Sequence, residues 1–136
     1  MSETKGSRDA QDYSWHKLVH LASDDAIFHG AVIRCKGRWP YEDIVDFLVV
    51  NNHDRERGMS LVVSSGYKAG LPLVVLPKES ETGHDNRADY ISVDWLKNNW
   101  TEWVYPDCDV MDVYVSTGYP PAGQLPQLTS AKDRRK

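Results

Sequence analysis

The chain has 136 residues, a net charge of −4, and ordinary shares of charged (26%) and hydrophobic (40%) residues. This length and composition are typical of one soluble globular domain that buries its own core. No segment approaches the roughly 20 continuous apolar residues of a membrane span, and the opening residues, MSETKGSRDAQDYS, lack the apolar run of a secretory signal. We therefore expect a cytoplasmic protein with no membrane-spanning segment.

The charge changes along the chain. The last five residues, KDRRK, carry +3 and residues 1–12 carry −1, which leaves −6 for residues 13–131. An acidic surface repels nucleic acid and attracts a basic partner at low salt. We expect a disordered N-terminus over residues 1–11, a single α+β domain over residues 12–119, and a flexible, Pro-containing basic tail over residues 120–136.

Within the expected domain, the first predicted element is a short amphipathic helix over residues 12–22. Apolar side chains recur there at the spacing of a helix face: Trp15, Leu18, Val19 and Ala22. A strand is predicted over residues 26–35, in which Gly30 can mark a bulge. A second strand covers residues 43–50, and the polar residues 51–58 form a loop after it.

The stretch SSGYKAGLPLVVLPKES, residues 64–80, allows two interpretations, a phosphate-binding glycine loop or the turn of a β-hairpin. A P-loop needs Gly-Lys-Ser/Thr at the start of a helix, whereas Gly70 is followed in this chain by Leu-Pro and an apolar run. Glycines on both sides of the turn permit the positive φ angles that hairpin loops often require. The sequence therefore predicts a hairpin of two strands, residues 59–65 and 71–77.

The C-terminal half contains the main predicted helix. After a charged connection over residues 78–90, Ser92 is the predicted N-cap of a helix over residues 93–104. A last strand is predicted over residues 110–116. We expect an α+β fold with an antiparallel sheet of about five strands, this helix packed on one face of the sheet, and the short N-terminal helix.

Four carboxylates within eleven residues form the most distinctive cluster: Glu102, Asp107, Asp109 and Asp112. They lack the spacing and central glycine of a calcium loop. Three interpretations remain: a solvated helix end and strand face, a docking patch for a basic protein, or the acid and base of a small hydrolase or transferase. In the docking interpretation, we expect Tyr105 or Tyr67 to act as an aromatic anchor.

No other set of residues indicates a cofactor or a reaction. His16 and His20 are four residues apart, but no further ligand completes a zinc site. Cys108 lies between two aspartates, whose charges disfavour a reactive thiolate. The aromatic-rich segment 89–116 contains a single basic residue, so stacking on nucleic acid is not expected. We therefore expect no metal, no cofactor and no nucleic-acid partner.

Two strings, LVVSSGYKAGLPLVVLPKES and ISVDWLKNNWTEWVYPDCDVMDVYV, resemble the immunity proteins of bacterial polymorphic toxin systems, in particular the group numbered 45. The resemblance covers about residues 38–117 and is most specific in SGYKAG, in DWL followed by NW, and in YPDCDV followed by DVYV. It implies a small cytoplasmic antidote that binds the toxic C-terminal domain of a contact-dependent or otherwise exported toxin, without catalysis or cofactor. It assigns no contact residues, and it does not include the predicted N-terminal helix, the HDNRADY connector or the basic tail.

The leading hypothesis is therefore an immunity protein that neutralises a cognate toxin domain by direct contact. A nuclease-type toxin is expected, because a nuclease presents cations for its substrate phosphates. The expected contact residues are Glu102, Tyr105, Asp107, Asp109, Asp112 and Tyr67. The alternative, a small hydrolase or transferase, requires at least two of the carboxylates to share one pocket. A third hypothesis is a regulatory or nucleic-acid-binding module that uses the KDRRK tail.

Overall fold

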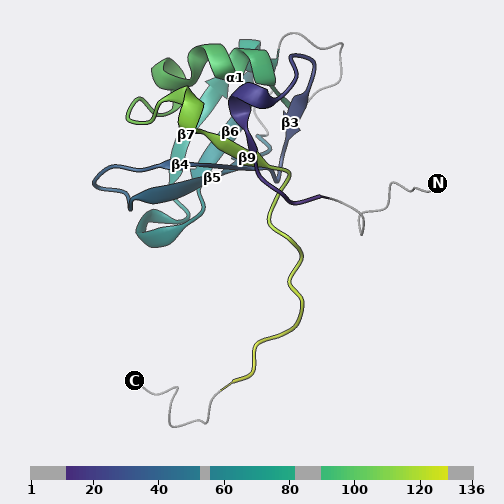
Figure 1. Cartoon of the computed structure of the whole chain (residues 1–136), viewed down its shortest axis with the longest axis vertical. Helices are drawn as coiled ribbons and strands as arrows, with labels where there is room; N and C mark the ends of the chain where they lie inside the picture. Colours follow the sequence, from purple (N-terminus) through teal and green to yellow (C-terminus); the bar gives the residue numbers. More distant parts are fainter. Residues whose placement is uncertain (1–11, 53–55, 82–89, 129–136) are drawn as a thin grey trace, which may run out of the picture.

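The computed structural model describes residues 12–52, 56–81 and 90–128 (Figure 1). In these ranges, six strands form one antiparallel sheet, in the spatial order β2 (His16–Lys17), β9 (Tyr114–Ser116), β4 (Val32–Lys36), β5 (Ile44–Val50), β6 (Arg57–Val63) and β7 (Pro72–Pro77). Two further strands pair as a small second sheet: β3 (Ala26–Phe28) and β8 (Tyr90–Ser92). The expectation for residues 1–11 lies outside the described residues.

One helix, α1 (Val93–Asn99), continues as a π-helical turn (Trp100–Val104), and together they cover the predicted helical span. Oγ of Ser92 accepts a hydrogen bond of 3.2 Å from the N–H of Trp95, so Ser92 is the N-cap, as predicted. Short 3₁₀ turns occur at Leu18–His20, Gly66–Lys68, Lys78–Glu81 and Val110–Asp112. The mostly antiparallel sheet with one helix agrees with the predicted α+β class, although the strands number six plus two rather than about five.

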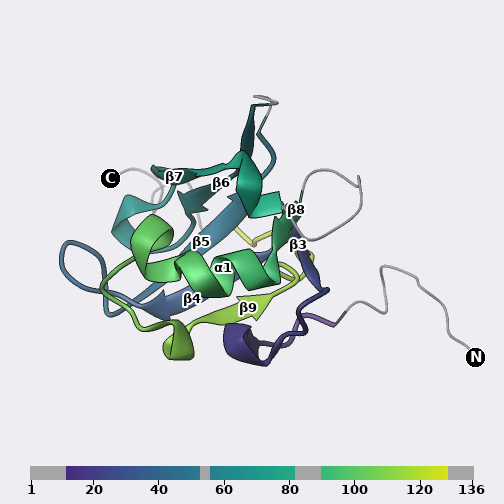
Figure 2. The same cartoon turned by 90° about the horizontal axis from the view of Figure 1, so that it is seen from above.

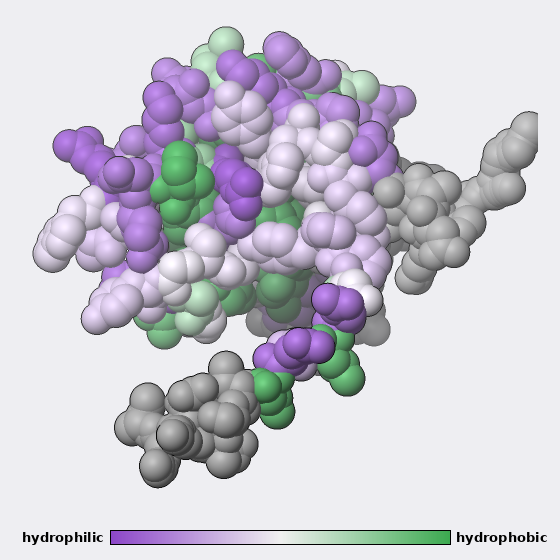
Figure 3. Space-filling view, turned by 60° about the horizontal axis from the view of Figure 1, so that its bottom comes forward, coloured by the Kyte–Doolittle hydropathy of each residue, from purple (hydrophilic) through white to green (hydrophobic). Residues whose placement is uncertain are grey.

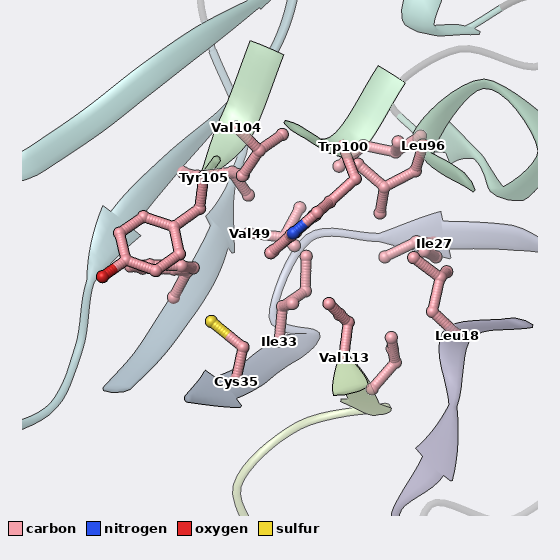
Figure 4. Close-up of a cluster of buried hydrophobic side chains, with 14 of the residues drawn as sticks. Leu18, Ile27, Ile33, Cys35, Val49, Leu96, Trp100, Val104, Tyr105 and Val113 are labelled. Carbon is pink, nitrogen blue, oxygen red and sulfur yellow. The ribbon is translucent and has the colours of Figure 1, made fainter. Parts of the chain in front are cut away.

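The core lies between the helix and one face of the six-stranded sheet (Figure 2). Strand β5 alternates: Val45, Phe47 and Val49 point into the core and are 0% exposed, as expected for a strand with one buried face. From the helical side, Leu96 and Trp100 enter the same core, and Figure 4 shows the Trp100 ring reaching from the helix towards the strands. Burial of apolar surface between these two layers is the main force that holds the fold together.

The segment over residues 64–71 is a hairpin turn, as predicted. Strands β6 and β7 pair antiparallel, with Leu61 opposite Val74. Gly66 and Gly70 adopt φ angles of +70° and +96°, which favour glycine. The glycines of this stretch therefore shape a turn and do not form a phosphate loop.

The prediction of an N-terminal helix over residues 12–22 is wrong. These residues form β2, which pairs with β9, and one 3₁₀ turn. The N–H of Leu18 donates to the carbonyl oxygen of Val113 at 2.9 Å, and the Leu18 side chain is fully buried in the core. Trp15 lies instead on the opposite face of the sheet, with its ring centroid 4.3 Å from Cζ of Arg34. The apolar spacing therefore arises from side chains that serve two different faces, and not from one helix face.

The predicted strand over residues 26–35 is two strands in different sheets. Between β3 and β4 the chain turns at Gly30, whose φ is +90° and whose N–H donates to the carbonyl oxygen of Val49 at 2.8 Å. Gly30 therefore redirects the chain from the small sheet to the large one, and does not form a bulge. The predicted strand over residues 110–116 is also shorter, because its first three residues form a 3₁₀ turn that Asp109 caps.

Candidate protein interface

Three loops lie at one end of the six-stranded sheet, on the left in Figure 1: residues 37–43, 64–71 and 105–112. The topology places them there. Strands β4 and β6 run in the same direction, because both are antiparallel to β5, so the loops that follow them lie at the same end. Strand β9 is antiparallel to β4, so the loop that precedes β9 reaches this end as well. We call this surface the three-loop end.

Glu42 joins the first two loops. Its Oε2 accepts a hydrogen bond of 2.8 Å from the backbone N–H of Tyr67 in the hairpin. This bond is the main reason that the pKa of Glu42 lies below its ordinary value. Gly66 makes the contact possible, because a Cβ at that position would overlap the Glu42 carboxylate. The same glycine therefore shapes the turn and admits the side chain that ties the two loops together.

Arg38 joins the first loop to the third. Its backbone N–H donates to the hydroxyl oxygen of Tyr105 at 2.9 Å, and its Nη1 lies 3.9 Å from Oδ1 of Asp107. Lys36, at the end of β4, makes a similar contact, with its Nζ 3.7 Å from Oδ2 of Asp112. Both ion pairs are exposed, and exposed pairs of this kind add little stability. Their carboxylates therefore remain available to the cations of a partner.

Tyr105 lies beneath this surface. The residue is 5% exposed, and its ring packs edge-on against the rings of Tyr41 and Phe47, with centroid distances of 5.8 Å in both pairs. Burial is the first cause that raises the pKa of its hydroxyl. The expectation that Tyr105 is an aromatic anchor does not fit this buried position. Its hydroxyl supports the first loop through Arg38 instead.

The four predicted carboxylates lie along the third loop and the π-helical turn before it: Glu102, Asp107, Asp109 and Asp112. Of these, Asp112 is half-buried and the other three are exposed. Oδ1 of Asp109 also accepts a hydrogen bond of 3.0 Å from the N–H of Met111, which caps the following turn. Tyr67 is 91% exposed in the hairpin. The structure thus brings Tyr67 to the same end of the sheet as the third loop, although the two are distant in the sequence.

Trp39 is not among the contact residues expected from the sequence. Trp39 is 90% exposed in this loop. One signal was available: a tryptophan inside the polar turn GRWPYED, outside any periodic apolar pattern, is not placed to join a core. Glu42 was missed as well, because its contact with the hairpin depends on the sheet topology.

A second polar cluster lies on the sheet face opposite the helix. Figure 3 shows apolar side chains among polar ones on the side of the molecule from which the C-terminal segment leaves. Arg34 donates two hydrogen bonds to Asp46, and the Tyr119 hydroxyl lies 2.8 Å from Oδ2 of Asp46 and 2.9 Å from Oγ of Ser64. The Asp46 contact raises the pKa of Arg34, and burial is the main cause that raises the pKa of Tyr119. Since its polar groups are paired with one another, the cluster attaches the segment after β9 to the sheet.

The described residues offer little support for catalysis. Across residues 12–52, 56–81 and 90–128, no three or more His, Cys, Asp or Glu side chains are placed to hold a metal ion. One hollow of about 400 Å³ is mainly apolar and lies among β2, β3 and β9, and another of about 420 Å³ lies beside α1. None of the four predicted carboxylates lines either hollow. The hydrolase hypothesis, which needs two of them in one pocket, gains no support from these hollows.

A family model described as Immunity protein 45 matches residues 18–115 of the chain. The match begins at residue 18 rather than near residue 38, where the resemblance in the sequence begins, so it also includes β3 and β4. No curated protein and no solved structure matches the chain. Within the part of the chain that the structure describes, no helix has both the length and the apolar character needed to cross a membrane.

Proposed function

Because the chain belongs to the Immunity protein 45 family, we propose that it binds a cognate bacterial toxin domain in the cytoplasm and neutralises it by direct contact. The match to the family model carries this proposal. Among the described residues, it runs from Leu18, the first buried side chain, to the last strand, β9, so every described residue of the core lies inside it. The match therefore spans the strands that position the three-loop end.

The proposed contact surface is the three-loop end together with the adjacent Glu102. Three observations support this choice. Its predicted carboxylates are exposed or half-buried, its hairpin presents an exposed tyrosine, and its loops are joined by the contacts of Glu42 and Arg38. A surface that is already ordered loses little conformational entropy when a partner binds. Tyr105 contributes from beneath, as a support for the first loop.

A toxin of the nuclease type fits the charge of this surface. Such an enzyme presents lysines and arginines to the phosphates of its substrate, and carboxylates opposite them speed encounter and fix the orientation of the complex. The exposed pairs Lys36–Asp112 and Arg38–Asp107 can exchange their cations for those of the toxin, because each pair is weakly held. Inhibition in this proposal is binding alone, without catalysis or cofactor.

Co-expression with the C-terminal domain encoded by the neighbouring upstream gene tests the proposal. We expect the two proteins to co-purify as a complex that persists at micromolar concentration, and an excess of this chain to abolish the toxic activity. Absence of a complex at micromolar concentration contradicts the proposal.

A pair of charge variants then tests the acidic surface. Asp107→Asn with Asp109→Asn removes two charges, and the asparagine amide oxygen can still cap the turn at the second position. We expect the association rate at low salt to fall about tenfold, with a weaker dependence on salt. The matched control, Asp24→Asn with Glu79→Gln, removes two exposed charges away from the three-loop end. If the association rate falls equally in the two variants, the carboxylates of the three-loop end do not guide the association.

A further inference from the structure

Two aromatic side chains at the three-loop end are almost fully exposed. Trp39 in the first loop is 90% exposed, and Tyr67 in the hairpin is 91% exposed. Large aromatic side chains are on average well buried, so two exposed ones at the same end of a sheet are informative. Ile44 directly follows the first loop and is 54% exposed, and Leu71 in the hairpin is 52% exposed, so both add apolar surface at this end. Exposed apolar surface that is rimmed by polar residues marks an interaction site.

The two loops that present these aromatics are ordered by hydrogen bonds. The N–H of Gly37 donates to the carbonyl oxygen of Asp43 at 2.7 Å and closes the first loop. A Cβ at Gly37 would overlap the backbone of Glu42, so the loop is tightly closed there. The bond from the N–H of Tyr67 to Glu42 then fixes the hairpin against the first loop. Because the loops are connected in the free protein, less entropy is lost when the aromatics enter a partner.

The charges around the aromatics favour a basic partner. Six carboxylates belong to or adjoin the three-loop end: Glu42, Asp43, Glu102, Asp107, Asp109 and Asp112. Three cations accompany them: Lys36, Arg38 and Lys68. Two of these cations already face carboxylates within the chain. The excess of negative charge is therefore complementary to a surface on which cations surround an apolar pocket.

We infer that Trp39 and Tyr67 are the two anchors by which this chain holds the toxin, each inserted into an apolar pocket of a basic surface. The inference rests on the proposed function and names residues for it. Tryptophan and tyrosine are enriched among the few residues that dominate the binding energy of protein interfaces, and such residues lie at the centre of the contact. The carboxylates then form the surrounding rim, where they guide association and orientation more than affinity.

Single alanine variants test the inference against the C-terminal toxin domain of the neighbouring upstream gene. We expect Trp39→Ala to weaken binding about 30-fold or more and Tyr67→Ala about tenfold or more, the range of interface anchors. Trp39→Phe keeps a smaller ring and should recover part of the loss. Leu125→Ala is the matched control, because Leu125 is 88% exposed on the C-terminal segment and lies outside the three-loop end. Its affinity should stay within about threefold of the wild type.

The outcomes separate the inference from the proposed function. If the wild type binds the toxin domain while Trp39→Ala and Tyr67→Ala bind as well as Leu125→Ala, the inference is overturned and the proposed function stands. If the wild type forms no complex, both are overturned. Because the two side chains are almost fully exposed, the melting temperatures of the variants should equal that of the wild type. An affinity loss at unchanged melting temperature supports the anchor role.

Discussion

Arg34 and Asp46 face each other in register across β4 and β5 and are joined by two hydrogen bonds, of 2.6 Å to Oδ1 and 2.9 Å to Oδ2. Their surroundings are unequal, because the Asp46 side chain is 4% exposed and the Arg34 side chain is 41% exposed. The guanidinium also contacts the ring of Trp15, whereas the carboxylate depends on its protein donors. When the pair is broken, the buried carboxylate therefore loses more of its stabilising interactions than the guanidinium does.

This asymmetry predicts that removal of Arg34 and removal of Asp46 lower the free energy of unfolding by unequal amounts. Arg34→Met leaves a buried carboxylate without its charge partner and should lower the free energy of unfolding by about 2–3 kcal/mol, less than a fully buried pair because water reaches the arginine. Asp46→Ala leaves a guanidinium that water can solvate, so it should lower the free energy of unfolding by less than Arg34→Met does. Urea unfolding of both variants measures the difference. The control Lys36→Met, which removes an exposed pair, should cost less than about 1 kcal/mol. A larger cost for Asp46→Ala than for Arg34→Met would contradict this asymmetry.

The helix tryptophans give a second prediction. Trp100 is 1% exposed, and its Nε1–H donates to the carbonyl oxygen of Cys108 at 2.8 Å, whereas Trp103 on the same turn is 42% exposed. Trp100→Ala should lower the free energy of unfolding by about 3–5 kcal/mol, because it opens a cavity in the core and leaves a buried carbonyl group unpaired. Trp103→Ala should cost about 1–2 kcal/mol, because that side chain already faces solvent. Similar denaturation midpoints for the two variants would show that the helix does not pack as described.

The contact between Gly66 and Glu42 predicts a difference between two glycines of one turn. Both Gly66 and Gly70 have positive φ, so alanine at either position should cost about 1 kcal/mol of stability through backbone strain. A Cβ at Gly66 would also overlap the Glu42 carboxylate, whereas a Cβ at Gly70 meets nothing within 4 Å. Gly66→Ala should therefore also free the hairpin from the first loop, which amide hydrogen exchange at Tyr67 would detect. In a Glu42→Ala background, the two glycine variants should become equivalent, and a persistent difference would argue against the contact.

The thiols predict how stability changes at alkaline pH. Cys35 and Cys108 are free and buried, and burial is the main cause that raises the pKa of Cys35, with Cys108 as the next cause. A raised folded-state pKa contributes stability that is fully present below the unfolded thiol pKa of about 8.5 and is lost as the pH rises above it. The free energy of unfolding should therefore decrease above about pH 8.5, by up to about 1.4 kcal/mol per pH unit for one thiol. Cys35→Ala should remove the contribution of this thiol to the decrease of the free energy of unfolding with pH. An unchanged decrease in the variant would show that Cys35 is not its source.

Several elements of the fold were predictable because their signals are local. The apolar run of β5, the two glycines of the hairpin and the serine that caps α1 each depend on residues close together in the sequence. The N-terminal segment was not predictable in this way. Its strand exists only because His16 pairs with Val115, and no pattern within residues 12–22 reports a partner so far along the chain. The separation of the predicted strand over residues 26–35 into β3 and β4 at Gly30 was not predictable for the same reason, because it depends on the sheet that each strand joins.

In the candidate interface too, some residues were predictable from local sequence and others depended on the sheet topology. The carboxylates of the third loop are close together in the sequence, so their clustering was visible from composition. Trp39 and Glu42 reach the same surface only because β4 and β6 are parallel to each other and deliver their loops to one end of the sheet. Tyr105 shows the reverse case, because the sequence suggests it as an anchor among carboxylates, whereas the structure buries it beneath Arg38. Local composition indicated the carboxylates and Tyr67, and topology was needed to place Trp39 and Glu42 at the same end of the sheet.

Amide hydrogen exchange tests most directly the proposal that a toxin binds through the three-loop end. The wild-type chain is compared alone and in complex with the C-terminal toxin domain of the neighbouring upstream gene. We expect new protection concentrated in residues 37–43, 64–71 and 105–112. A stable complex in which protection appears instead at β3 and the apolar hollow beside it, with these three loops unchanged, would show that the toxin binds elsewhere.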